Sequence, residues 1–335
     1  MSDVDTPAPT APLGRRPSAS LLTSFVGRET DLQDVLALVQ NPAIRLITVT
    51  GPGGVGKTRL TTELMNRIDP ATMPGGIVMV ELAAITDPAA VPGEILRALE
   101  DGRAPIVPEL EAITLAFANQ PALLMLDNLE QVVSVAPVLQ EILMRCPELT
   151  IVVTSRLILR VRGEHEYVLE PLEMTATADG DPPAAVQLLI DRAGTARGNR
   201  SGGLDPEIAQ RICQRVDGLP LAIELAAAQM RVLGPEHVLD RLERGAVLPS
   251  TGPRDMPARQ QTMERAVAWS VDLLQQPERD LFSRLAVFAS GFDIEAGLAG
   301  IGLDRGRLLG RGGCRVEARG SRHGDPPREP TRAGG

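Results

Sequence analysis

Aromatic residues and cysteine are scarce in this sequence. Aromatic residues make up 2% of the 335 positions, so the hydrophobic cores must be built from aliphatic side chains. The three cysteines, Cys146, Cys213 and Cys314, are far apart and odd in number, which excludes a disulfide framework and the paired spacing of a zinc site. We therefore expect a protein of the reducing cytoplasm.

Long hydrophobic runs are also missing. No stretch reaches the roughly 18 uninterrupted apolar residues of a membrane span, and residues 1–20 lack the apolar centre of a secretory signal. We therefore expect no membrane partner. Because 43% of the residues are hydrophobic, the chain as a whole is not disordered, although residues 1–22 are typical of a disordered leader.

Lysine occurs once: of the 34 basic residues, all but Lys57 are arginine. It lies in an eight-residue stretch that matches the phosphate-binding pattern G-x-x-x-x-G-K-[ST]. In such a loop the glycines let backbone N–H groups turn toward phosphates, the lysine adds a point charge, and the last hydroxyl can complete a Mg²⁺ shell. The candidate binding residues are Gly51, Pro52, Gly53, Gly54, Val55, Gly56, Lys57 and Thr58.

The segments around this loop have the order that phosphate binding requires. Residues 45–50 form a short β-branched run, and Leu60, Leu64 and Ile68 follow the loop at the spacing of one helix face. A strand, a loop and a helix in this order point the helix N-terminus at an anion. This context disfavours the alternative, a glycine-rich turn that binds nothing.

A carboxylate completes the predicted metal site. Residues 123–127 form an apolar run that ends in Asp127, the arrangement that holds Mg²⁺ together with Thr58; the alternative role for Asp127 is a helix N-cap. Asn128 follows, where motor-type ATPases carry a catalytic glutamate. Glu130 is the nearest alternative base, so we expect slow hydrolysis or none.

The pattern of elements predicts an α/β fold. Apolar strands at 45–50, 77–82, 121–127 and 149–156 alternate with amphipathic helices, which predicts a parallel P-loop NTPase sheet within residues 23–170. From 171 to 247 helices take over, with a helix start at Asp205-Pro206, an end at Gly218 and a new start at Pro220. After a linker, clustered aromatic residues within 258–300 predict a separate small helical core.

Residues 301–335 differ from everything before them. They are rich in glycine and arginine, and eight Arg against four acidic residues give them a charge of +4, which leaves −13 on residues 1–300. We interpret this tail as disordered and as the product of a frameshifted or truncated reading frame; the alternative is an RG-rich nucleic-acid tail. The acidic remainder argues against direct DNA binding by the folded part.

Six stretches in this order resemble the NB-ARC subgroup of STAND signalling ATPases. They are 25–29, 51–58, 124–130, 154–156, 218–222, and 268–270 through 291–292. The resemblance is to the nucleotide-binding part of bacterial LuxR-type and antibiotic-regulator-type transcriptional regulators, which is akin to the apoptosome scaffold and plant disease-resistance proteins. It implies that the helical domain is followed by a partial winged-helix domain at 258–300.

The resemblance also implies roles for single residues. Val26, Gly27 and Arg28 would line the adenine, and Pro220 would pack against the base from the helical domain. Arg156 would sense the γ-phosphate, and Arg59 counts with the cofactor-binding residues. Residue-level alternatives remain: a loop before a helix for 26–28, a sheet-end ion pair for Arg156 and a hairpin turn for Pro220. The family's winged-helix histidine motif has no match, because His323 lies in the tail.

The implied function is a switch controlled by ATP, ADP and Mg²⁺. ADP would hold the two domains closed, and ATP would open them for self-association. Family members carry a helical-repeat sensor and a DNA-binding domain, and neither is visible in this sequence. The alternative function is an AAA+-like working ATPase.

Overall fold

The computed structural model describes residues 23–99, 107–117, 120–176, 181–197, 204–230, 232–244, 271 and 276–285. The chain forms two compact units, 1–269 and 270–335, and the described helix of the second is α11 (Gln276–Leu285). The leader, Trp269, the motif at 291–292 and the tail with Cys314 and His323 lie outside the described residues, as does most of the expected winged-helix segment.

A five-stranded parallel sheet forms the centre of the first unit. The strands are β1 (Leu46–Thr50), β2 (Ile77–Glu81), β3 (Ala122–Asp127), β4 (Leu149–Thr154) and β5 (Glu164–Val168), in the order β2-β3-β4-β1-β5. The parallel α/β sheet and its four expected strands are confirmed. The fifth strand was missed because its sequence, Glu-His-Glu-Tyr-Val, is mostly polar. It pairs with β1, and its residues are only partly buried or exposed.

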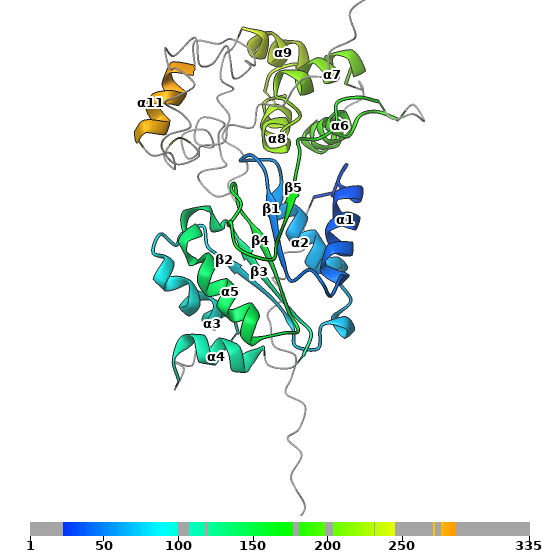
Figure 1. The fold of residues 1–335 in the computed structure, drawn as a ribbon. Coiled ribbons are helices and arrows are strands. Elements are labelled where there is room, and N and C mark those ends of the chain that lie inside the picture. Colours follow the sequence, from blue (N-terminus) through cyan, green and yellow to red (C-terminus); the bar gives the residue numbers. More distant parts are fainter. Residues whose placement is uncertain are drawn as a thin grey trace, which may run out of the picture. The chain divides into compact units, whose positions relative to one another are not determined.

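Helices cover both faces of the sheet (Figure 1). Alternation along β3 shows why: Leu123 and Met125 belong to one core, whereas Leu124 and Leu126 belong to the other. The first core is closed by α1 (Glu29–Gln40) and α2 (Lys57–Arg67), the second by α3 (Val91–Leu99), α4 (Glu109–Ala116) and α5 (Ala136–Arg145). Short 3₁₀ turns lie at Pro70–Thr72, Pro88–Ala90, Leu129–Gln131 and Val133–Val135.

A topological switch lies at the carboxyl ends of β1 and β3, which flank β4 in the sheet. The chain leaves β1 through α2 on one face and leaves β3 through α5 on the other. Crevices at the carboxyl ends of such strands are where ligands bind in open parallel sheets. The fold therefore predicts a ligand site at the carboxyl ends of β1, β3 and β4.

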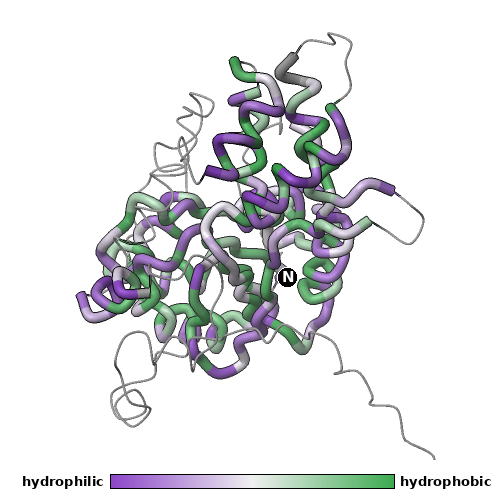
Figure 2. Tube along the Cα trace, turned by 90° about the horizontal axis from the view of Figure 1, so that it is seen from above, coloured by the Kyte–Doolittle hydropathy of each residue, from purple (hydrophilic) through white to green (hydrophobic). Residues whose placement is uncertain are grey.

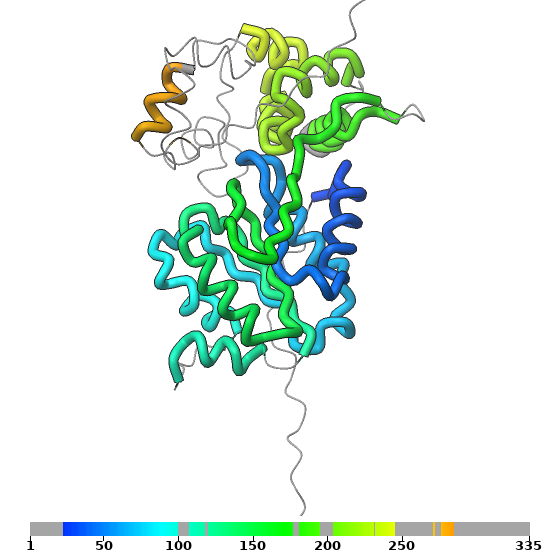
Figure 3. Tube along the Cα trace, viewed as in Figure 1, coloured from blue at the N-terminus to red at the C-terminus, as the bar shows by residue number. Residues whose placement is uncertain are grey.

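Four helices follow the sheet and share a third core: α6 (Ala184–Arg197), α7 (Pro206–Arg215), α8 (Pro220–Gln229) and α9 (Pro235–Glu243). Figure 3 traces the chain from β5 into α6, and Figure 2 shows hydrophobic and hydrophilic residues alternating along the helices. The helix starts expected at Asp205 and Pro220 are confirmed, and the Asp205 carboxylate accepts from Glu207 N at 2.8 Å. Within the described part of the chain, no helix is long and apolar enough to span a membrane.

The turn between α7 and α8 depends on Gly218. Its φ of +64° is left-handed, and its amide N–H donates to Cys213 O at 3.0 Å, as glycine does after a helix. Its carbonyl accepts from Leu172 N, also at 3.0 Å, which ties the turn to the chain that leaves the sheet. Gly218 therefore places Pro220 and the start of α8.

Gly218→Ala should lower the free energy of unfolding by roughly 2–4 kcal/mol, because the left-handed φ strains alanine and the close approach adds a clash. The new Cβ would lie 2.5 Å from Leu172 O. Gly163→Ala is the matched control: its φ is +78°, but no atom lies within 4 Å of the added Cβ. The control should lose only about 1 kcal/mol in urea unfolding. Equal losses for the two variants would contradict this account of the turn.

Candidate functional site

The glycine-rich loop joins β1 to α2 at the switch point. Gly51, Gly54 and Gly56 have φ angles of 146°, 81° and 102°, a region that side chains rarely adopt. A Cβ at Gly51 would lie 2.5 Å from Leu169 O, whereas a Cβ at Gly56 would meet no atom within 4 Å. The loop is thus shaped by glycine and open at Gly56, as a cradle for a phosphate group requires.

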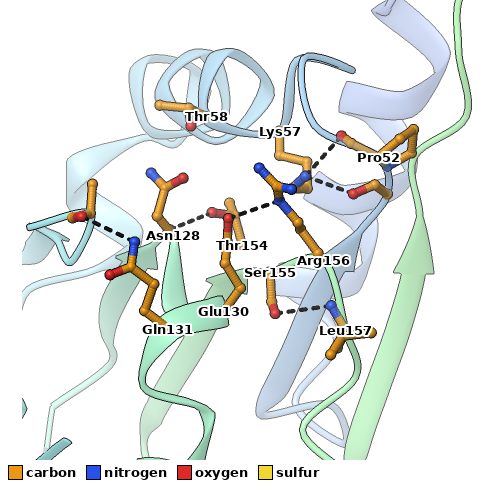
Figure 4. A network of polar contacts seen from close by, with 12 residues as sticks. Pro52, Lys57, Thr58, Asn128, Glu130, Gln131, Thr154, Ser155, Arg156 and Leu157 are labelled. Carbon is orange, nitrogen blue, oxygen red and sulfur yellow. Dashed lines mark hydrogen bonds and ion pairs between the residues drawn. The ribbon is translucent and has the colours of Figure 1, made fainter. Parts of the chain in front are cut away.

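Lys57 is the first residue of α2, and its ammonium points back into the loop. Nζ donates to Gly51 O at 2.7 Å and to Pro52 O at 3.1 Å (Figure 4). Burial lowers the pKa of Lys57 to about 8; Glu130 opposes the shift, Arg156 adds to it, and Asp127 opposes it. The loop therefore holds a desolvated ammonium that an anion would stabilise.

Thr58 and Asp127 meet as the sequence predicts. Thr58 Oγ1 lies 2.9 Å from each Asp127 carboxylate oxygen, and Thr154 Oγ1 donates to Oδ1 at 2.5 Å. Asp127 is buried, and its burial raises the pKa of the carboxyl, although the two hydroxyls oppose this shift. Thr154 belongs to the stretch 154–156 that carries the resemblance, but no role was predicted for it; its position at the end of the neighbouring strand is the signal that could have indicated one.

These oxygen atoms fit a magnesium ion. Carboxylate and hydroxyl oxygens are ligands that Mg²⁺ prefers, and the Asp127 carboxylate accepts hydrogen bonds from the hydroxyls of Thr58 and Thr154 and from the amide of Asn128. In the described ranges no group of three or more His, Cys, Asp or Glu side chains could hold a metal by itself. A magnesium ion here would therefore need phosphate or water oxygens to complete its shell.

Asn128 does not take the place of a catalytic glutamate. Its φ of 62° is left-handed, and its backbone N–H donates to Thr154 Oγ1 at 2.9 Å. Its Nδ2 donates to Asp127 Oδ2 at 2.5 Å, so the amide supports the carboxylate. A side chain held in this way cannot accept a proton from water.

Glu130 and Arg156 form an ion pair beside Lys57. Arg156 Nε lies 3.3 Å from Glu130 Oε1, and the two side chains are 20% and 6% exposed (Figure 4). The other carboxylate oxygen, Glu130 Oε2, is buried without a hydrogen-bond partner. A buried acceptor of this kind is costly to leave unsatisfied, which makes it a place for a water or ligand donor.

The start of α8 lies against the loop. Leu221 N donates to Gly54 O at 3.1 Å, and a Cβ added to Gly54 would lie 2.9 Å from Leu221 Cβ. Pro220 is the first residue of this helix and directly precedes Leu221; its packing against a base, which the resemblance implies, stays a prediction. The contact made by Leu221 itself was not predicted, because it uses a backbone N–H group that any residue carries.

The segment before α1 also reaches this region. Val26 packs against the core of the four-helix part, and a Cβ added to Gly27 would lie 2.4 Å from Ala184 Cβ of α6. Arg28 is buried, and its guanidinium binds Asp31, Val55 O and Glu170 O. Arg59 Nη2 donates to Thr23 O at 2.5 Å, and burial lowers the pKa of its guanidinium.

Comparisons with known proteins agree with this geometry. A family model described as an AAA ATPase domain matches residues 24–159, which include every candidate site residue except Pro220. Among solved structures, the Walker-type ATPase PABY2304 of Pyrococcus abyssi has a TM-score of 0.50 at 11% identity, covering 88% of this chain and 92% of that one. This likeness shows the fold alone.

Two relatives come from Mycobacterium tuberculosis. The uncharacterized protein Rv0894 is 38% identical over 83% of this chain and 69% of its own length. A protein named as a candidate HTH-type transcriptional regulator, Rv0890c, is 35% identical over 77% of this chain but only 28% of its own length. This protein therefore belongs to the same family as Rv0894 and carries an AAA ATPase domain.

Proposed function

We propose that this chain is the nucleotide-controlled switch of a transcriptional regulator, a STAND ATPase of the NB-ARC, LuxR-type group, acting in the cytoplasm. The observation that carries the proposal is the direct bond between Leu221 N of α8 and Gly54 O of the phosphate-binding loop. A nucleotide in the loop would touch both residues 23–170 and the helices within 171–247. Its phosphates can then control how the two parts pack, and ATP would favour self-association.

The residues divide the work of holding a nucleotide. Lys57 is placed to exchange its two carbonyl partners for phosphate oxygens, and Thr58 with Asp127 would hold Mg²⁺. Bound Mg²⁺ would supply positive charge to the phosphates during transfer. Val26, Gly27 and Pro220 would surround the base. This division accounts for the desolvated ammonium of Lys57 and for the buried carboxylate of Asp127, which Thr58 contacts.

Hydrolysis would depend on Glu130 and Arg156. The Arg156 guanidinium is held by Glu130, and a third phosphate would compete with that carboxylate for it. Glu130 Oε2 is a buried oxygen that lacks a donor, which supports a role for Glu130 in orienting an attacking water. Because the ion pair must first be released, we expect turnover to be slow.

A working ATPase is the second candidate function, and the AAA ATPase domain match favours it. Turnover separates the two: a working ATPase has a kcat on the order of 1 s⁻¹ or more, whereas a switch has a much lower value. Steady-state phosphate release from the purified protein decides between them. A kcat on the order of 1 s⁻¹ or more would contradict the switch and favour the working ATPase.

Nucleotide affinity should depend on the charge of Lys57. Because burial lowers the pKa of Lys57 to about 8, part of the side chain is a neutral amine at higher pH, and this amine must take up a proton when ADP binds. The affinity is then full below this pKa and is lost above it, falling about tenfold between pH 7 and pH 9. Calorimetry in two buffers of different ionisation enthalpy measures the proton uptake.

The reference for that measurement is Lys57→Ala. It should keep the fold, since it removes the cost of burying an ammonium, and it should lose ATP and ADP binding. Retained micromolar affinity in this variant, or a pH-independent affinity in the wild type, would contradict the role of Lys57.

Arg156→Ala should weaken ATP binding by roughly 1.5–3 kcal/mol, the range of a charged hydrogen bond, and leave ADP binding nearly unchanged. ATP and ADP should differ because we expect the Arg156 guanidinium to contact a third phosphate but not a second. Arg162→Ala, an exposed arginine that follows on the same loop, is the matched control. Equal losses of affinity for ATP and ADP would contradict a contact between Arg156 and the γ-phosphate.

A further inference from the structure

The guanidinium of Arg28 is bonded to the backbone of the phosphate-binding loop. Nη2 donates to Val55 O at 3.1 Å and to Glu170 O at 2.6 Å, and Nη1 pairs with Asp31 Oδ2 at 3.0 Å. The residue is 8% exposed. Two of its three guanidinium nitrogens are thus committed to the protein, and the third, Nε, is buried without a hydrogen-bond partner among the described residues.

The bond to Val55 O controls the direction of the next amide. In a planar trans peptide the carbonyl oxygen and the following N–H point in opposite directions, and no cis peptide occurs among the described residues. When Arg28 holds Val55 O on the outer side of the loop, the Gly56 N–H must point to the inner side. That is the side on which phosphate oxygens would lie.

This peptide needs such a constraint. Gly56 has no side chain to favour one conformation, its φ is 102°, and a Cβ there would touch no atom within 4 Å. No side chain at Gly56 therefore restrains the peptide plane between Val55 and Gly56. The Arg28 guanidinium adds a constraint from outside the loop.

The second carbonyl extends the same constraint to the end of the sheet. Glu170 lies two residues after β5, and the preceding Leu169 donates its N–H to Thr50 O at 2.8 Å. One guanidinium therefore connects the loop after β1 to the chain that leaves β5. The connection holds the loop at a fixed position relative to the sheet edge.

We propose that Arg28 is a positioning residue, which sets the phosphate-binding loop in its anion-binding conformation and does not read the base. The inference rests on the proposed function, that this loop binds phosphate. If Arg28 has this positioning role, it must support the binding of any ligand that carries a diphosphate, whatever base is attached.

The test compares the affinities of Arg28→Ala and wild type for ADP, GDP and inorganic pyrophosphate. The affinities for all three ligands should fall by the same factor, roughly 10- to 100-fold. The buried Val55 carbonyl loses its hydrogen-bond partner, and the loop loses its preference for the anion-binding conformation. Arg97→Ala is the matched control: Arg97 also forms an ion pair three residues away along the chain, with Glu94 at 2.7 Å, but it is 68% exposed. It should change none of the three affinities.

Other outcomes would overturn the proposal. A base contact predicts that pyrophosphate binding stays unchanged while the ratio of ADP to GDP affinity falls. A merely structural role predicts a lower melting temperature with all three affinities intact. If Arg28→Ala does not fold, Arg28→Lys replaces it, since a single ammonium cannot hold both carbonyls and Asp31; its pyrophosphate affinity must lie below that of wild type. A wild type that binds none of the ligands would contradict the proposed function itself.

Discussion

The structure around the site depends on where the carbonyl groups of the phosphate-binding loop point. Gly51 O and Pro52 O accept from Lys57, Gly54 O accepts from Leu221 N, and Val55 O accepts from Arg28. These donors come from α2, from α8 and from the segment before α1. Gly54 O and Val55 O accept from groups outside the loop, and Gly51 O and Pro52 O from the Lys57 ammonium, so the backbone amides of the loop are left for an anion, as in helix N-termini and backbone nests. The helical part and the N-terminal segment therefore belong to the site.

The charges beside the loop form a balanced group that a nucleotide would disturb. Two cations, Lys57 and Arg156, face two carboxylates, Asp127 and Glu130, at the ends of β3 and β4. Burial lowers the pKa of Lys57 and raises that of Asp127, so desolvation opposes the charged form of both groups. Phosphates would stabilise Lys57 and compete for Arg156, and a divalent cation would stabilise Asp127. A change in the number of phosphates therefore changes which carboxylates and cations pair with one another, and this is the physical basis of the proposed switch.

The sequence predicts those parts of the site that a short local pattern of residues marks. The loop, Thr58 with Asp127 and the helix start at Pro220 follow from spacing, an apolar strand end and a proline at the first helical position. It missed β5, because an edge strand of Glu, His and Tyr lacks the apolar run of a buried strand. It also missed the bond from Arg28 to Val55 O, and it left an ion pair of Arg156 as an alternative without identifying Glu130 as the partner. The two residues of each contact are 27 and 26 positions apart and meet only in the folded chain. Backbone donors such as Leu221 N leave no trace in residue identity.

If the loop and α8 together hold an adenine nucleotide, the nucleotide should stay bound during purification. Denaturing the purified protein and identifying the released small molecules by mass spectrometry measures this. The account predicts that ADP is released in an amount close to one per chain, since a ligand enclosed by two parts of the fold dissociates slowly. Release of no nucleotide, together with no uptake of added ADP or ATP in the presence of Mg²⁺, would contradict it.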